Sequence, residues 1–380
     1  MWTASTIMTR RPSVDDPTST SADAFTTPAS LASPADSGME DVAEAMGVGD
    51  TSAVRTINRG AFSTVTLVLD RMSGRYCALK ATRKADLLRT GAALSVVREK
   101  QALLALQPHP FVVQLFWTAQ DANHLYMLLQ LGLGGDLRGV LLRRRQSSYG
   151  PALAGEQVRF YASVLVLVLE HLHGKGFVYR DLKPDNVLLD ERGYPLLCDF
   201  GTAVHVGSSG RALTITGTWE YAAPEQLEGR GATMAADWWA LGVLCFECLT
   251  DGLPFPFAED DATQSPAHVL ECIARRVHTY KMAEQLSAAA ADFVGGMLQT
   301  DERRRWEAAL GARSAAFFAG VPWDALPSRT ATAPYVPDLR GPADTSNFSY
   351  ADLRTDGDGD GDGEDLEDRG ARHHAAWEAF

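Results

Sequence analysis

The 380-residue chain has few cysteines and no long hydrophobic run, and each shortage excludes a class of protein. The five cysteines are odd in number and widely scattered, so we expect a reducing compartment rather than a disulfide framework. Cys245 and Cys248 form a lone C-x-x-C in an apolar segment, which is typical of core cysteines rather than of a zinc or redox site. No apolar run reaches the roughly 18 residues that cross a membrane.

Basic charge is also in short supply. The chain has 48 acidic and 35 basic side chains and a formal net charge of −13, which argues against nucleic acid as a partner and suits basic substrates. Two arginines and no acids in the first residues leave a transit peptide as an alternative, but Asp15, Asp16 and Asp23 disfavour it. We therefore predict a soluble, cytoplasmic protein.

Composition and periodicity divide the chain into an arm, two lobes and a tail. Residues 1–52 are rich in Ser, Thr, Ala, Pro and Asp, which is typical of a disordered arm. Residues 53–131 are strand-like with one helical segment at 94–106, and residues 132–318 are mainly helical. The pattern predicts a bilobal α+β domain over 53–318, with a small β-rich lobe and a larger helical lobe. Residues 319–380, rich in Pro and Asp, read as an extended tail.

The strongest chemical signal is YRDLKPDNVLLDERGYPLLCDFG at 179–201. Phosphoryl transfer needs a carboxylate that orients the attacking hydroxyl, cations that neutralise developing charge, and ligands that hold Mg²⁺ on the phosphates. Asp181 fits the first role and Lys183 the second. Asn186 and Asp199 fit the third.

This string resembles the catalytic loop and DFG motif of eukaryotic protein kinases, which implies ATP and Mg²⁺ as cofactors. The family also pairs a strand lysine with a helix glutamate, and Lys80 in CALK and Glu99 in VVREKQAL match them. It pairs the glutamate of AAPE, here Glu225, with a buried arginine, here Arg305. Asp237 stands where the family uses an aspartate to brace the catalytic loop from below.

The glycine-rich loop of the family is short of glycine here. The pattern G-x-G-x-x-G-x-V would span 58–65, where the chain reads NRGAFSTV, so Asn58 and Ser63 replace glycines and Gly60 remains. Asparagine tolerates positive φ better than most residues, and Ser63 is still small, so we expect nucleotide binding to persist. The replacements leave a catalytically silent kinase-fold scaffold as the alternative, although the catalytic and metal residues favour an active enzyme.

Other motifs narrow the resemblance to the AGC group of serine/threonine kinases. YRD, GTWEYAAPE, DWWALGVL and the tail segments APYVPDLRGPADTSNF and WEAF look most like cyclic-nucleotide-dependent kinases. LYMLLQLGLGGDL and PWDALPSRTATAPYVP lean towards the cGMP-dependent branch over the cAMP-dependent catalytic subunit. No cyclic-nucleotide-binding domain is visible, so either a separate regulatory chain is a partner, or regulation has been lost or lies outside this sequence.

The resemblance also implies which residues contact ATP. Ile57, Val65, Ala78 and Leu188 would sandwich the adenine, with Leu129 as gatekeeper and Phe348 closing the pocket from the tail. The full set of implied contacts is Ile57, Asn58, Arg59, Gly60, Ala61, Phe62, Ser63, Thr64, Val65, Ala78, Lys80, Leu129, Leu188 and Phe348. Trp377 and Phe380 match a hydrophobic motif that docks on the small lobe and steadies the helix of Glu99.

The implied substrates are proteins with basic motifs. Asp136, Asp185 and Glu247 match positions whose carboxylates receive substrate arginines two and three residues before the phosphoacceptor, and Thr218 completes the substrate-binding set. Carboxylates that meet paired arginines give bidentate recognition and faster encounter. We therefore predict Arg-Arg-x-Ser/Thr substrates.

Two residues of the chain itself are candidate phosphorylation sites. Ser13 lies in RRPSV at 10–14, which carries what an acidic groove would bind and is a candidate autophosphorylation site. Thr214 aligns with the activation-loop phosphosite of the family, where a phosphate would pair with Arg180 and order the segment.

A third function is suggested by DGDGDGDGEDLE at 356–367, which fits the spacing of a calcium-binding EF-hand loop. Position eight of that loop, which should be apolar, is Gly363, and no partner hand is visible. A Gly-Asp repeat produces this match easily, so we favour an acidic flexible spacer over a calcium-binding regulatory module.

Overall fold

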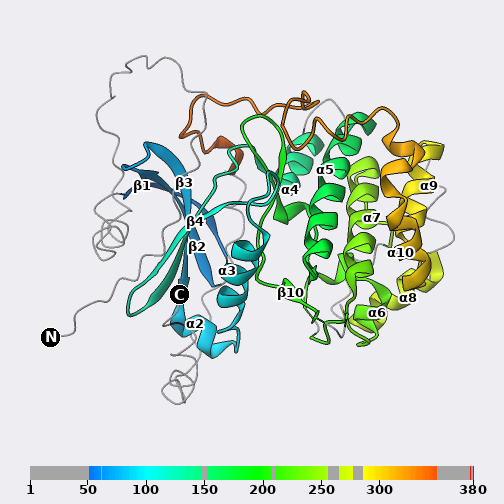
Figure 1. Ribbon diagram of the computed structural model, residues 1–380, viewed down its shortest axis with the longest axis horizontal. Helices are drawn as coiled ribbons and strands as arrows, with labels where there is room; N and C mark the ends of the chain where they lie inside the picture. The colour runs from blue at the N-terminus through cyan, green and yellow to red at the C-terminus, as the bar shows by residue number, and fades with distance from the viewer. Residues whose placement is uncertain are drawn as a thin grey trace.

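A computed structural model of the chain has the two lobes that the sequence predicts. Figure 1 shows a twisted sheet beside a larger group of helices, with the segment after the last helix (orange) returning across the top towards the sheet. Ser13, Ala61 and segment 356–367 lie outside the described residues. The structure describes residues 51–60, 62–146, 152–207, 210–214, 216–255, 265–276, 286–348, 377 and 380.

The small lobe is a five-stranded antiparallel sheet in the order β1-β2-β3-β5-β4. The first strand begins two residues before the expected domain start at 53. A six-residue helix, α2, was not predicted, because so short a helix shows no periodicity. The elements are β1 (Thr51–Arg59), β2 (Ser63–Asp70), β3 (Arg75–Arg83), α2 (Lys84–Arg89), α3 (Ser95–Leu106), β4 (Leu115–Gln120) and β5 (His124–Leu129).

The register of the sheet gives its two faces different partners. Val65 lies opposite Lys80, and Ala78 lies opposite Leu129, so these four side chains share one face. Ala78 and Leu129 belong to the hydrophobic core that continues into the helical lobe. The other face buries a separate small cluster of Val68, Cys77, Leu79, Tyr126 and Leu128. The face that carries Lys80 is therefore the one turned towards the second lobe.

The large lobe is built around two long apolar helices. The central α7 buries every residue from Ala235 to Leu249, Cys245 and Cys248 included, as expected for a helix that is apolar on all sides. In the part of the chain that the structure describes, no helix is both long and apolar enough to span a bilayer. The helices are α4 (Leu137–Arg145), α5 (Gly155–Gly174), α6 (Pro224–Leu227), α7 (Met234–Thr250), α8 (Pro266–Arg276), α9 (Ala288–Met297) and α10 (Glu302–Leu310).

Short strands position the loops where the lobes meet. One three-stranded group pairs in the order β6-β8-β9, and a second group pairs β7 with β10. The loops between them carry the predicted catalytic and metal residues. These strands are β6 (Gly135–Asp136), β7 (Phe177–Val178), β8 (Val187–Leu189), β9 (Pro195–Leu197) and β10 (Val204–His205).

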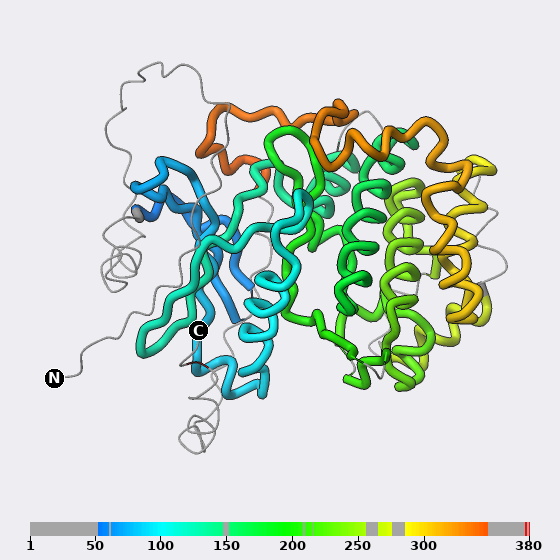
Figure 2. The backbone as a smooth tube through the Cα atoms, viewed as in Figure 1, coloured from blue at the N-terminus to red at the C-terminus, as the bar shows by residue number. Residues whose placement is uncertain are grey.

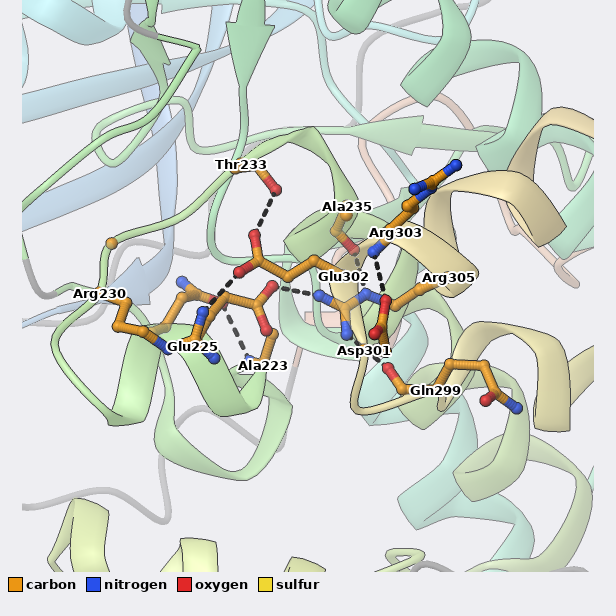
Figure 3. A network of polar contacts seen from close by, with 12 residues as sticks. Ala223, Glu225, Arg230, Thr233, Ala235, Gln299, Asp301, Glu302, Arg303 and Arg305 are labelled. Carbon is orange, nitrogen blue, oxygen red and sulfur yellow. Dashed lines mark hydrogen bonds and ion pairs between the residues drawn. The ribbon is translucent and has the colours of Figure 1, made fainter.

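A buried ion pair joins three parts of the large lobe. Arg305 of α10 and Glu225 of α6 have no exposed side-chain surface and form the predicted ion pair. Arg305 also donates to the main-chain oxygens of Ala235 (2.8 Å) and Gln299 (2.6 Å). Figure 3 shows this network together with Glu302, which accepts from Arg230. The guanidinium thus connects α6, the start of α7 and α10.

The substitution Arg305→Met is expected to lower the free energy of unfolding by about 3–5 kcal/mol, because it leaves the buried Glu225 carboxylate without its partner. Urea unfolding measures the loss. The matched control is Arg303→Met on the same helix, where the side chain is 88% exposed and pairs with Glu307. That change should cost about 1 kcal/mol or less. Equal losses in the two variants would contradict the assigned role of the buried pair.

Candidate active site

A buried carboxylate braces the catalytic loop from the helical lobe. Asp237 of α7 accepts the main-chain N–H groups of Tyr179 (2.9 Å) and Arg180 (2.8 Å), and Nε2 of His173 lies 2.8 Å from it. Arg180 has a φ of 73°, a left-handed conformation that is costly for a residue other than glycine. The two backbone hydrogen bonds offset that cost and hold the loop in place.

The carboxylate of Asp181 is fixed on three sides. Asn186 donates from Nδ2 to the main-chain oxygen (2.8 Å) and to Oδ2 (2.9 Å) of Asp181. Nζ of Lys183 lies 3.0 Å from Oδ2, while the N–H and hydroxyl of Thr218 donate to Oδ1 at 3.1 and 3.0 Å. Lys183 also donates to the Thr218 hydroxyl (2.6 Å). The structure thus brings together four residues predicted from two separate motifs.

Close packing at Gly217 allows this approach of the activation segment. Gly217 has a φ of 101°, and a Cβ there would lie 2.5 Å from the main-chain oxygen of Arg180. Only glycine fits this contact without displacing the catalytic loop. Gly217 therefore lets the activation segment lie close enough to the catalytic loop for Thr218 to contact Asp181.

A lysine on the sheet links the lobes by charge. Nζ of Lys80 on β3 donates to both carboxylate oxygens of Glu99 on α3 (2.9 and 2.8 Å) and lies 3.8 Å from Oδ1 of Asp199. Burial disfavours the ammonium, but Asp199 and Glu99 outweigh it and raise the pKa of Lys80. Lys80 in turn is the main cause that lowers the pKa of Asp199, against the effect of burial. The ion pair predicted from the two sequence motifs is present.

Asn186 and Asp199 fit a magnesium ion by their chemistry. Asp199 is kept ionised by Lys80. The Nδ2 of Asn186 is engaged by Asp181, which leaves its amide oxygen as the ligand atom. Mg²⁺ prefers one or two carboxylates or amide oxygens together with phosphate oxygens of the substrate, and these two side chains supply that set.

The predicted adenine contacts lie at the junction of the lobes. Ile57, Ala78 and Leu129 are buried there, and Val65 and Phe348 pack against the same core. Leu188 lies directly against the chain that connects the lobes, where a Cβ on Gly132 would be 2.8 Å from the Leu188 Cβ. That close approach explains why glycine stands at 132.

The glycine-poor hairpin closes without a positive φ at Asn58. Asn58 lies opposite Val65 directly after an irregularity in the β1–β2 pairing between Thr56 and Asn58, and Ser63 lies opposite Thr82 in regular pairing. Asn58 is not among the described residues that have positive φ. Gly60 donates its N–H to the main-chain oxygen of Ser63 (2.8 Å) and completes the turn. The tolerance of asparagine for positive φ is therefore not used at residue 58, because β1 continues through it.

The tail after α10 is fastened beside the adenine pocket. Asn347 donates from Nδ2 to the main-chain oxygen of Leu133 (3.0 Å) and accepts from Arg143 of α4 at its own main-chain oxygen (3.0 Å). Gly135 has a φ of 74°, and a Cβ there would lie 2.6 Å from that same oxygen. Figure 2 traces this segment (orange) from the helical lobe to the sheet. These contacts place Phe348 against the core at the lobe junction.

Trp377 and Phe380 pack on the small lobe, as the sequence predicts. Both side chains are buried, at 6% and 7% exposure. Nε1 of Trp377 donates to the main-chain oxygen of Ala93 (3.2 Å), just before α3. The main-chain oxygen of Phe380 accepts from Lys100 of α3 (2.6 Å) and from Thr118 of β4. The pair therefore contacts the helix that carries Glu99.

The three carboxylates predicted to receive substrate arginines have different surroundings. Asp136 accepts the N–H of Gly139 (2.8 Å) at the start of α4, and burial, with Asp185 adding to it, raises the pKa of Asp136 to about 6. Glu247 is buried and forms an ion pair with Arg138, which also lies 3.3 Å from Asp185. Our reading of the sequence missed Arg138, because nothing local links it to a residue on α7.

Thr214 lies next to Arg180, which the sequence analysis expects to pair with a phosphate on this threonine. Nη1 of Arg180 donates to the hydroxyl (2.6 Å) and to the main-chain oxygen (3.0 Å) of Thr214. Its Nε donates to the main-chain oxygen of Thr202 (2.7 Å). Arg180 therefore ties the activation segment to the loop after Asp199.

Comparisons with known proteins agree with this geometry. Residues 51–316 match the family described as protein kinase domain. The cAMP-dependent protein kinase catalytic subunit PRKX of Mus musculus is 36% identical, over 84% of this chain and 86% of that protein. A cAMP-dependent protein kinase, catalytic subunit-like, of Caenorhabditis elegans is 33% identical, over 83% and 76%. The human myotonin-protein kinase is 34% identical, over 81% of this chain and 48% of that protein.

The substitution Lys80→Met is expected to raise the pKa of Asp199 towards its ordinary value. Since the ammonium keeps that pKa low, Asp199 of the wild type stays ionised as the pH falls, whereas the variant takes up a proton at higher pH. Mg²⁺-dependent binding of a fluorescent nucleotide, measured from about pH 3 to pH 7, should weaken as the pH falls, and this acidic limb should lie at higher pH in the variant than in the wild type. The control is Lys175→Met on an exposed lysine. An unmoved limb would contradict the assignment.

The substitution Trp377→Ala is expected to lower kcat about tenfold, corresponding to ~1.4 kcal/mol, because α3 loses a buried contact and Glu99 is held less firmly. Peptide phosphorylation at saturating ATP measures it. Leu310→Ala is the control, since Leu310 is 73% exposed on the last turn of α10. Full activity of the Trp377 variant, with the tail shown to be detached, would rule out this coupling.

Proposed function

Since the chain belongs to the protein kinase family and is a serine/threonine kinase of the AGC type, we propose that it transfers the γ-phosphate of ATP to Ser/Thr in Arg-Arg-x-Ser/Thr segments, in signalling controlled by a cyclic nucleotide. The observation that carries the proposal is the set of contacts around Asp181. Its carboxylate is held by Asn186, Lys183 and Thr218 and is itself largely buried. A carboxylate so oriented is suited to accept the proton of an attacking hydroxyl.

The neighbouring side chains have roles that follow from their charge. Lys183, bound to Asp181 and Thr218, presents an ammonium for the phosphoryl group in transfer. Lys80, oriented by Glu99, holds the α- and β-phosphates. Asn186 and Asp199 hold Mg²⁺, which when bound neutralises charge on the phosphate oxygens. Asn58 and Ser63 both remain paired in the sheet, which supports nucleotide binding and weighs against a silent scaffold.

The control of the enzyme is proposed from its relatives and from the activation segment. Two relatives are named as cAMP-dependent catalytic chains, which supports a separate cyclic-nucleotide-binding regulatory chain as partner. The lean towards the cGMP-dependent branch stays a prediction. At Thr214 a phosphate would meet Arg180. Burial is the main cause that lowers the pKa of Arg180, and the charge of the nearby Arg98 lowers it as well. A phosphate between two such cations would order the segment.

The proposed function is tested with a peptide of residues 8–18, which contains RRPSV. Wild-type protein with ATP and Mg²⁺ is expected to phosphorylate it at the serine that corresponds to Ser13, and Asp181→Asn and Asp199→Ala are expected to lose about a hundredfold or more of the activity. Mass spectrometry locates the phosphate. If the wild type binds ATP but phosphorylates neither this peptide nor other basic peptides after phosphorylation of Thr214, the chain is a scaffold.

A further inference from the structure

Arg138 is held among acidic groups beside the catalytic loop. It is the second residue of α4, and its side chain is 21% exposed. Nε lies 3.3 Å from Oδ2 of Asp185, Nη1 contacts Oε1 of Glu247, and Nη2 donates to the hydroxyl of Tyr221 (2.6 Å). Each of the three guanidinium nitrogens therefore has a partner on a different element.

These partners border the place where a substrate chain must lie. Asp185 is in the 3₁₀ turn η1 (Pro184–Asn186), directly before Asn186, which contacts Asp181. Tyr221 ends the 3₁₀ turn η3 (Trp219–Tyr221), directly after Thr218, which contacts Asp181 from the other side. Two partners of Arg138 are thus close along the chain to residues that contact the proposed catalytic carboxylate: Asp185 is next to Asn186, and Tyr221 is three positions after Thr218.

Arg138 already offsets part of the negative charge of Asp185 and Glu247. The side chain of Glu247 is 5% exposed and also accepts a hydrogen bond from the Tyr221 hydroxyl. Burial disfavours the charged guanidinium, but Tyr221, Glu247 and Asp185 outweigh it and raise the pKa of Arg138. A substrate arginine would have to displace the Arg138 guanidinium, which is bound on three sides. Arg138 is also part of the folded enzyme, so its binding does not carry the entropic cost of ordering a separate peptide.

We propose that Arg138 is a specificity-determining residue that occupies, from within the chain, the arginine subsite formed by Asp185 and Glu247. The inference rests on the proposed function for the identity of the substrate groove. In the wild-type enzyme, a substrate arginine at this subsite adds little binding free energy. Only one of the two arginines in an Arg-Arg-x-Ser/Thr segment therefore contributes strongly to substrate binding. Removal of the Arg138 side chain leaves two carboxylates unpaired, and the subsite then selects for arginine.

The test compares three peptides of residues 8–18: the natural sequence, one with Arg10→Leu and one with Arg11→Leu. For wild-type protein, one of the two substitutions is expected to change kcat/KM by less than about threefold. In Arg138→Leu the same substitution is expected to lower kcat/KM about tenfold, because the substrate arginine now binds the free carboxylates. Arg138→Gln keeps hydrogen-bond donors for Glu247 and is the second variant if the leucine variant fails to fold.

The matched control is Arg145→Leu, which removes the same charge from the same helix. Arg145 contacts Asp251, away from the cluster, so its loss should leave peptide preference as in the wild type. Strong discrimination by the wild type against both single substitutions would overturn the proposal. So would an unchanged preference in folded Arg138→Leu or Arg138→Gln.

A binding measurement separates this proposal from the proposed function. The same three peptides with alanine at the position of Ser13 bind without accepting phosphate, and fluorescence anisotropy gives their Kd. A gain of about tenfold in arginine selectivity on removal of Arg138 supports the occupied subsite, even if no peptide is ever phosphorylated. If the three serine-containing peptides are phosphorylated but removal of Arg138 gives no gain in selectivity, the kinase function is supported and the role of Arg138 is rejected.

Discussion

The hydrogen bonds from the catalytic loop to Asp237 are the constraint on which the rest of the site depends. A buried carboxylate on the central helix of the large lobe accepts two consecutive backbone N–H groups, at Tyr179 and Arg180. They hold Arg180 in a left-handed conformation, from which its guanidinium reaches Thr202 and Thr214. The next residue is Asp181, so the same two bonds set the direction of the proposed catalytic carboxylate. A strained loop is thus anchored in the most buried part of the molecule.

In the small lobe, the position of α3, which carries Glu99, depends on contacts made by the tail. Lys80 points into the junction because its strand pairing sets the face of the sheet, but its partner Glu99 lies on α3, which could shift independently. Trp377 and Phe380 pack against that helix and its approach. Near the pocket, Asn347 joins the tail to the chain that connects the lobes. The described parts of the tail, up to residue 348 and at Trp377 and Phe380, therefore pack with the two lobes that carry the predicted site.

Charge on the substrate side is distributed unevenly. The chain carries a net charge of −13, and the three carboxylates that we predict to receive substrate arginines are at 136, 185 and 247. They are not equivalent, because Asp136 caps α4 while Glu247 is buried in an ion pair. Net acidity attracts basic substrates, whereas selectivity among them depends on which carboxylate is still uncompensated once the chain has folded. An acidic composition alone does not separate these two effects.

Sequence by itself determined the two-lobed α+β architecture and most of the proposed site. Strand-like alternation and helical periodicity are local signals, and the string at 179–201 places a base, a cation and metal ligands within one short segment. The pairing of Lys80 with Glu99 was implied by the resemblance to protein kinases, which CALK and VVREKQAL carry, and either residue alone would have been taken for surface charge.

The tertiary structure decided what depends on packing between distant segments. Whether β1 continues through Asn58 is settled by pairing with β2, not by the preference of asparagine for a backbone conformation. The partner of Glu247 is 109 positions away along the chain, on another helix, and no local pattern connects the two. Side chains from distant segments meet only after folding, and their contacts depend on shape and charge in the assembled core. Local sequence patterns therefore do not predict these contacts.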